Sequence, residues 1–417
     1  MKTEVINSIL TDDLKEAERL IARQPDRLEL LADLLKKVKD KPVPLKPLKA
    51  QAPKFIGVLP SYTCEFRCKM CNSGFQDRSF LFDDYKYFLP EQYEKLSVWL
   101  NLASDITFVG LGETLNSPYI HYFLKKIVNK HSTIYTNGLL LNRKKIQMLI
   151  NSNLNCLVLS FDGKLSIGHG SGKEKYIQTF WQKVQLIQKV KKDFNSKLPV
   201  VKLVVAVAGE NIDDLDNVIE TALRYNVTHI ILALMKPLNE KMYRKSIFAD
   251  FDESKRRINS ISSRWNKKGI LVTAIAYTKR LRDSLKVCPF VDNWLHLHGR
   301  SNALGVCCGS IEMPVYSDNP QMEHWNSFPF RYFRYLHFYL NRQKLPYICK
   351  NCRALNLKEF SRSFASLFRQ SKNKKEISAD PLALYSTASS LKKHNRIGEA
   401  EKLFWKVSAR FLFNVSI

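Results

Sequence analysis

The chain has 417 residues, 45% of them hydrophobic and 25% charged, which excludes a largely disordered protein and leaves room for one large domain and a smaller one. Lys and Arg outnumber Asp and Glu by 66 to 39, for a formal net charge of +27, but the basic residues are spread out and do not favour a nucleic-acid partner. There is no secretory signal and no apolar run near the roughly 20 residues of a membrane helix, so we expect no membrane segment and a cytoplasmic location, where thiols stay reduced.

The first expected unit, residues 1–50, is a helical segment followed by a proline-rich linker. Apolar side chains recur at helical spacing over residues 1–40, and the stretch KPVPLKPLKAQAPK that follows contains four prolines. Because proline cannot continue a helix or a strand ladder, we expect this stretch to connect the helices to the main domain.

The main domain is expected over residues 51–280. Short runs rich in β-branched residues alternate there with amphipathic stretches, a rhythm typical of parallel strands joined by crossover helices. Six strand–helix repeats fit a partial (βα)6 barrel of the TIM type better than a full barrel of eight. We expect strands within residues 55–60, 105–112, 133–138, 154–163, 200–209 and 228–235, helices near 90–104, 119–130, 142–151, 173–192 and 211–225, and then a helix near 251–268 and a strand near 270–276.

The loop after the first expected strand carries three cysteines within TCEFRCKMC. Cys64, Cys68 and Cys71 are separated by three and then two residues, unlike the paired CxxC unit of a zinc ribbon. Three thiolates can hold three irons of a [4Fe–4S] cluster and leave the fourth iron open to another ligand. A zinc knuckle or unrelated buried thiols are the competing interpretation, whereas Cys156, within the fourth strand, is expected to be an ordinary core thiol.

This cysteine pattern, on the loop after a first strand, resembles the radical S-adenosylmethionine (SAM) superfamily. The resemblance implies that the open iron binds SAM and that reduction cleaves SAM to a 5′-deoxyadenosyl radical, with electrons from a donor such as a flavodoxin or ferredoxin. It also implies SAM contacts at Gly110, Gly112 and Glu113 in FVGLGETLNSP, a segment similar to the family's GGE loop. Glycine permits close backbone approach to a ligand, and a carboxylate suits an ammonium group.

Further strand ends resemble the same family. Asn137 in TNG, and Ser160 and Asp162 in SFDG, are the implied contacts with SAM or the substrate. Asn211 in GENIDDL matches a frequent family asparagine, but an asparagine that opens a helix also acts as a cap, which is the interpretation we favour. The arginine that often follows the fourth strand has no counterpart near Gly168, so the residue that pairs with the SAM carboxylate stays open.

A second cysteine-rich module is expected over residues 281–360, and it resembles the SPASM/twitch extension of radical SAM enzymes. Five cysteines there support one auxiliary [4Fe–4S] cluster, with Cys308 competing for the second ligand position and a structural zinc site as the alternative. The expected ligands are Cys288, Cys307, Cys349 and Cys352. Residues 361–417 end in a helical hairpin similar to one tetratricopeptide unit, although a helical cap on the domain explains the pattern equally well.

Together these features predict a radical SAM oxidoreductase or maturase acting on a peptide or protein side chain. The same chemistry on a sugar, polyol or other small metabolite is the first alternative. RNA modification, motivated only by the charge, and a non-catalytic iron–sulfur interaction protein are the others.

Overall fold

The computed structural model of the chain describes most of the expected main domain and isolated parts of the second module. The residues described are Arg19, 50–66, Cys68, Cys71, 86–110, 112–161, Gly163, 172–235, 240–275, Val291, 293–297, 303–305, 312–314, Trp325, Asn326, Phe330 and Arg334. Outside them lie the predictions for most of residues 1–49, for residues 361–417, and for Asp162, Cys288, Cys307, Cys308, Cys349 and Cys352.

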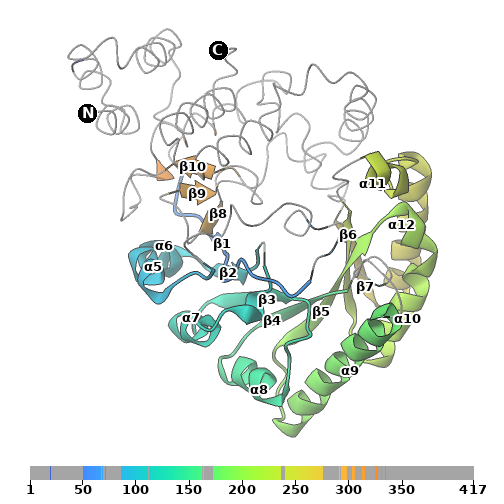
Figure 1. The fold of residues 1–417 in the computed structure, drawn as a ribbon, viewed down its shortest axis with the longest axis horizontal. Helices are drawn as coiled ribbons and strands as arrows, with labels where there is room; N and C mark the ends of the chain where they lie inside the picture. The colour runs from blue at the N-terminus through green and yellow to red at the C-terminus, as the bar shows by residue number, and fades with distance from the viewer. Residues whose placement is uncertain are drawn as a thin grey trace.

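One sheet organises the described residues, in the strand order β10-β9-β8-β1-β2-β3-β4-β5-β6-β7 (Figure 1). Each neighbouring pair from β8 to β7 is parallel, which makes eight parallel strands, and β9 and β10 continue the β8 side as an antiparallel hairpin. The strands are β1 (Phe55–Val58), β2 (Asp105–Phe108), β3 (His131–Thr136), β4 (Cys156–Ser160), β5 (Val200–Val207), β6 (His229–Leu234), β7 (Leu271–Ile275), β8 (Trp294–Leu297), β9 (Ala303–Gly305) and β10 (Glu312–Pro314). Because β7 and β10 form its two edges, the sheet is open.

The helices between the parallel strands lie along the outer side of the curved sheet (Figure 1). They are α5 (Pro90–Lys95), α6 (Ser97–Leu102), α7 (Ile120–Lys126), α8 (Arg143–Asn151), α9 (Gly172–Asp193), α10 (Leu215–Arg224), α11 (Glu240–Lys245) and α12 (Phe251–Lys267), with 3-10 helices η3 (Thr114–Asn116) and η5 (Gly209–Asp214). Local sequence sets some of these starts. Pro90 occupies the first turn of α5, and the Asn142 side chain accepts a hydrogen bond from Lys145 N (2.9 Å) to cap α8.

The two faces of the sheet differ in burial, as β5 shows. Val201, Leu203, Val205 and Val207 are buried and belong to the hydrophobic core, whereas the alternate residues of the strand are partly exposed. Side chains of a strand alternate between faces, so the first set packs against the helices and the second faces the opposite, inner side. Burial of each such side chain contributes about 1.5–3 kcal/mol, which fixes the register of the strand.

All the strands and helices expected in the main domain are confirmed in position, but the expected number of strands is too low. β8 pairs in parallel with β1, Phe55 opposite Trp294, with their rings stacked at 6.1 Å, so the sheet continues past residue 280. In the sequence WLHL the apolar residues do not alternate with polar ones, so it lacks the period-two pattern of a half-buried strand. The short helix α11 also escapes prediction.

A buried cluster ties the segment around Trp325 to the chain just before β1. Trp325 Nε1 donates to Gln51 O (2.9 Å), and Asn326 exchanges two hydrogen bonds with the Ala50 backbone (2.8 and 3.0 Å). The guanidinium of Arg334 lies 4.4 Å from the Trp325 ring centroid and donates to Trp325 O (2.9 Å). Hydrogen bonds and a cation–π contact therefore connect Trp325, Asn326 and Arg334 to one another and to the chain before β1.

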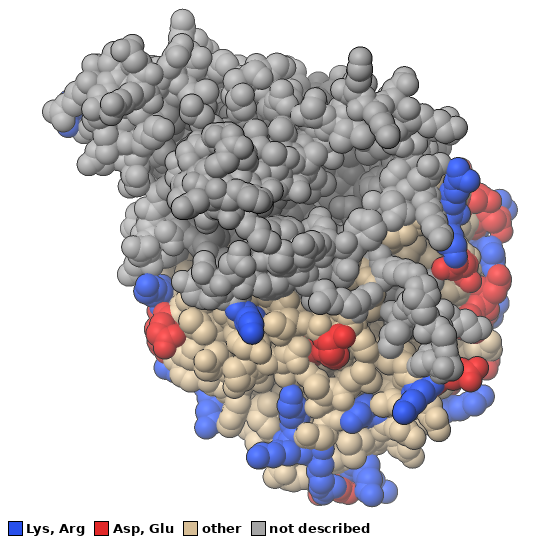
Figure 2. Space-filling model, viewed as in Figure 1, with Lys and Arg blue, Asp and Glu red and all other residues tan. Residues whose placement is uncertain are grey.

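The surface is mixed in charge. On the face shown in Figure 2, Lys and Arg side chains are spread over the described residues, and Asp and Glu side chains lie among them along the right-hand edge. Helices in the described part of the chain all lack the combination of length and apolar character that a membrane crossing needs.

Candidate functional site

The loop that follows β1 carries the three predicted cluster ligands. Cys64, Cys68 and Cys71 are partly exposed, and none is in a disulfide. Cys71 N donates to Cys68 O (3.0 Å), and Phe66 N donates to Cys64 Sγ (3.4 Å). Phe66 in turn packs edge-on against Tyr176 of α9, with ring centroids 5.4 Å apart. An N–H directed at a sulfur stabilises the thiolate form that a metal requires.

The chemistry of this donor set fits an iron–sulfur cluster. Three thiols lie within eight residues of one loop at the carboxyl end of a parallel strand, where ligand sites of such sheets occur. Within the part of the chain that the structure describes, no three His, Cys, Asp or Glu side chains are already gathered as a metal site. The fit therefore rests on residue type, spacing and place in the fold.

Glu113, in the loop after β2, lies between the cysteine loop and the end of β3, and only 3% of the residue is exposed. Its Oε1 accepts hydrogen bonds from Thr136 Oγ1 (2.5 Å) and Leu115 N (2.9 Å), and its Oε2 accepts from Asn137 N (2.8 Å). Burial raises the pKa of the Glu113 carboxyl, the three hydrogen bonds lower it, and the nearby charge of Glu65 raises it. The side chain thus joins the loop after β2 to the end of β3.

The backbone at Gly112 and Glu113 packs closely against the start of the cysteine loop and hydrogen-bonds to it. Glu113 N donates to Thr63 O (2.7 Å), and a Cβ added at Gly112 would lie 2.6 Å from both Ser61 O and Thr63 O. A Cβ at Gly110 would meet Leu59 Cγ at 2.8 Å. The sequence predicts that these glycines let the backbone approach a ligand. In the structure, the atoms close to them belong to Leu59, Ser61 and Thr63 of the same chain.

Asn137 brings a second carboxylate, Glu65, to the same place. Asn137 Nδ2 donates to Glu65 Oε1 (2.6 Å), while Asn116 Nδ2 donates to Glu65 Oε2 (3.4 Å) and to Thr63 O (3.2 Å). The sequence analysis selects Asn137 but misses Glu65, Asn116 and Thr136. Each of the three lies within three residues of a selected residue. This closeness in the sequence is the signal that could have identified them.

The other predicted residues behave differently. Ser160 is half-buried at the end of β4, on the inner face of the sheet, and among the described side-chain contacts none joins it to the Glu113 cluster. Asn211 Oδ1 accepts from Ala208 N (2.8 Å), and its Nδ2 donates to Ala206 O (2.8 Å), so it closes the turn after β5. The N-cap expected at Asn211 lies instead at Ala208. Asn211 is the third residue of η5, and its side chain accepts a hydrogen bond from the backbone N–H of Ala208.

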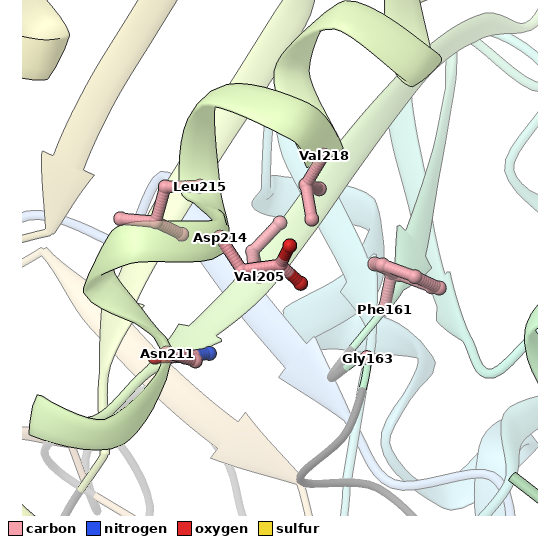
Figure 3. A pocket seen from close by; sticks show the side chains of 7 residues that line it. All are labelled: Phe161, Gly163, Val205, Asn211, Asp214, Leu215 and Val218. Atoms are coloured by element: carbon pink, nitrogen blue, oxygen red, sulfur yellow. The ribbon is translucent and has the colours of Figure 1, made fainter.

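A small hollow lies near the ends of β4 and β5, and Figure 3 shows the Asp214 carboxylate directed from the start of α10 towards Phe161. The hollow encloses about 220 Å³, part of it open to solvent, which is less than the usual volume of a small-molecule site. Phe161 packs against Phe180 and Trp181 of α9, so the hollow is on the helix side of the sheet. We therefore do not assign it to the candidate site.

The inner face carries a group of titratable side chains further from the strand ends. Cys156 is buried, as expected of a core thiol, but it lies on the inner face. Burial raises the pKa of the Cys156 thiol, and the Lys202 charge lowers it. Burial also raises the pKa of Tyr135 and lowers that of His229.

Comparisons with known proteins agree with this geometry. Residues 58–222 match the family model described as "Radical SAM superfamily". No curated protein sequence matches the chain.

Similar solved structures share the fold. Native anSMEcpe with bound AdoMet (S-adenosylmethionine) is 15% identical, with a TM-score of 0.53 over 77% of this chain and 100% of that chain. AnSMEcpe with AdoMet and the Cp18Cys peptide is 14% identical, with a TM-score of 0.54 over 77% and 98%. Streptococcus suis SuiB bound to the precursor peptide SuiA is 13% identical, with a TM-score of 0.51 over 73% and 70%.

Proposed function

We propose that this chain is a radical SAM enzyme that oxidises or modifies a peptide or protein side chain with help from one auxiliary iron–sulfur cluster. The observation that carries the proposal is the position of Cys64, Cys68 and Cys71 on the loop after β1, inside the matched region 58–222. An open cluster needs three protein thiolates and one free iron, and this loop offers that number of cysteines.

The residues of the chain divide into three tasks. The three loop cysteines would hold the cluster. A reduced cluster of this kind supplies the electron that cleaves SAM to a 5′-deoxyadenosyl radical, which abstracts a hydrogen atom from the substrate. The SAM site would be lined by Gly110, Gly112, Glu113, Asn137, Ser160 and Asp162. The described contacts give Glu113 a bracing role, because its carboxylate ties the loop after β2 to β3.

The rest of the architecture is proposed on the same basis. The open sheet of eight parallel strands would be the partial barrel of the family, extending residues 51–280 by β8. Residues 281–360 would form a SPASM/twitch module with an auxiliary cluster on Cys288, Cys307 or Cys308, Cys349 and Cys352. Residues 1–50 and 361–417, whose sequences favour helices, would flank these two units and hold a protein partner.

A peptide substrate is supported by the proteins that share the fold. Two of them are solved with peptides, SuiB with its precursor peptide SuiA and anSMEcpe with the Cp18Cys peptide. An external electron donor such as a flavodoxin or ferredoxin would supply the reducing electron.

The deciding experiment is anaerobic reconstitution followed by metal analysis and incubation with SAM and a reductant. We expect about eight irons per chain, as two [4Fe–4S] clusters require, together with release of 5′-deoxyadenosine. About four irons plus zinc would leave the radical site and remove the auxiliary cluster. Faster release of 5′-deoxyadenosine with a peptide pool supports the peptide proposal, whereas a response only to sugars and polyols contradicts it.

Replacement of Cys64, Cys68 and Cys71 together by Ala tests the assignment of the cluster. The variant should lose SAM cleavage entirely and about four irons while it keeps the second metal centre. The matched control is Cys156→Ala, which removes a thiol of the same sheet from outside the loop and should keep all the iron. Cleavage that survives the triple replacement would refute the proposed function.

A further inference from the structure

We propose that the inner face of the sheet binds a carboxylate of the substrate, and that Lys202 of β5 is the residue that contacts it. This inference rests on the proposed function and narrows its substrate class to peptides with an acidic group close to the reacting side chain. It starts from the charged residues of the eight parallel strands. These strands contain one Lys or Arg, which is Lys202, and one carboxylate, which is Asp105 of β2.

Strand register places Lys202 among polar side chains of the inner face. Lys202 lies opposite Val158 of β4, which in turn lies opposite Tyr135 of β3. Two residues earlier on β4, Cys156 lies opposite Thr133. Because side chains of a strand alternate between faces, all of these side chains project from the same face of the sheet.

His229 of β6 completes this group on the other side of Lys202. Leu203 lies opposite Ile230, so the residues just before them, Lys202 and His229, are neighbours on the inner face. The positive charge of Lys202 accordingly lowers the pKa of His229. Ammonium, hydroxyl, thiol and imidazole groups can all donate hydrogen bonds, and a group of donors suits an anion. We call these residues the inner cluster: Thr133, Tyr135, Cys156, Lys202 and His229.

The charge of Lys202 is not balanced by a carboxylate. Asp105 forms its ion pair with His131 (3.1 Å), and the ion pairs of the described residues do not include Lys202. Burial raises the pKa of the Cys156 thiol above its ordinary value of 9.0, so this neighbour is neutral at neutral pH. A partly buried ammonium among neutral groups keeps its charge available for an anionic ligand.

The inner cluster lies close to the strand ends where we propose the cofactor to bind. Ser160, the last residue of β4, is opposite Val204, which is two residues after Lys202 on β5. Two residues of a strand span about 7 Å. A substrate whose carboxylate binds Lys202 would therefore extend towards the carboxyl end of β4. Lys202 would fix the substrate by one end and thereby orient the side chain that reacts.

The test is affinity selection of peptides by the reconstituted holoenzyme, read by mass spectrometry at about 0.3 M salt, which screens the general positive charge of the surface. The probe is a random hexapeptide pool, acetylated and amidated at its ends, so that Asp and Glu supply all its carboxylates. We expect the wild type to enrich Asp and Glu over Asn and Gln. For Lys202→Gln this enrichment should fall about 10- to 100-fold, the usual worth of a charge-assisted hydrogen bond.

Three further variants separate the charge at this position from folding and from net charge. Lys202→Arg should keep the acidic preference, and Lys202→Glu should select Lys and Arg instead. Lys189→Gln, which changes an exposed lysine of α9, alters the net charge by the same amount as Lys202→Gln and should select peptides like the wild type. A second pool with free carboxyl ends and no Asp or Glu identifies the source of the carboxylate. Enrichment from this pool indicates a terminal carboxylate, and enrichment from the first pool alone indicates an acidic side chain.

The inference is overturned if the wild type shows no acidic preference, or if Lys202→Gln keeps that preference at unchanged iron content and thermal midpoint. Release of 5′-deoxyadenosine by the wild type is measured in parallel. A wild type that releases none overturns the proposed function, whatever peptides it selects. A wild type that releases 5′-deoxyadenosine, with an acidic preference that does not depend on Lys202, overturns the inference alone.

Discussion

The segments that follow two strands of this sheet, β2 and β5, both contain the dipeptide Gly-Glu, but the two glutamates have different surroundings. After β2, Gly112 packs on the cysteine loop and Glu113 is buried in hydrogen bonds to Thr136, Asn137 and Leu115. After β5, the exposed Glu210 forms a surface ion pair with Lys245 (2.6 Å). The comparison shows that the dipeptide alone does not define a site, because the neighbouring loops decide whether its carboxylate is buried or solvated.

The packing of the backbone at Gly112 and Gly209 differs in the same way. A Cβ at Gly112 would lie 2.6 Å from backbone oxygens of the cysteine loop, whereas one at Gly209 would lie 3.2 Å from Lys245 O. The loop after β2 is joined across strands to β1 and β3. The turn after β5 is closed mainly within itself, by the two bonds of the Asn211 amide. Cross-linking between loops therefore distinguishes the loops after β1, β2 and β3, where we propose the cofactor to bind, from the turn after β5.

The largest difference should appear when each glutamate is truncated. Glu113→Ala leaves three donors without their acceptor in a buried place, and we expect the free energy of unfolding to fall by about 3–5 kcal/mol. Glu210→Ala, the matched control, removes an exposed ion pair and should cost less than about 1 kcal/mol. Urea unfolding of both variants measures the two values. Equal losses would remove the distinction between the two strand ends.

The fold at these strand ends is readable from the sequence because burial alternates along it. The run VVKLVVAV of β5 places its buried residues at every second position, and the loops with the expected glycines follow the strands as predicted. The eighth parallel strand is not readable, since the apolar residues of WLHL do not alternate with polar ones. This segment is identified as a strand only by its pairing with β1.

The sequence predicts at which strand ends the site residues lie, but it does not predict which side chains they contact. Sequence spacing places Glu113 at the end of β2, but the direction of its carboxylate depends on Thr136 and Asn137, which belong to the next strand and its loop. Glu65 is missed for a related reason. A charged residue inside a cysteine motif looks like an ordinary solvated side chain until Asn137 and Asn116 are seen to hold it.

Replacement of Gly112 and of Gly209 by alanine should give the next largest difference in the free energy of unfolding. Gly112→Ala forces its Cβ against the backbone at Ser61 and Thr63, which cannot move aside as a flexible side chain could, and we expect a loss of about 1–3 kcal/mol. Gly209→Ala meets looser contacts and should lose less. Thermal unfolding and the iron content after reconstitution report both effects. A Gly112→Ala variant as stable as Gly209→Ala would contradict the close packing against the cysteine loop.

The smallest expected effect is a pH dependence that belongs to Glu113. Burial raises its folded-state pKa above the ordinary value of 4.5 in spite of the hydrogen bonds that lower it, so the folded protein holds this proton more tightly than the unfolded chain does. Its contribution to stability is then fully present below the unfolded pKa and is lost as the pH rises through the folded one. The free energy of unfolding of the wild type, minus that of Glu113→Gln, should therefore decrease from acid towards neutral pH. A difference that grows with pH would mean that the hydrogen bonds from Thr136, Asn137 and Leu115 outweigh burial and hold the Glu113 carboxylate ionised.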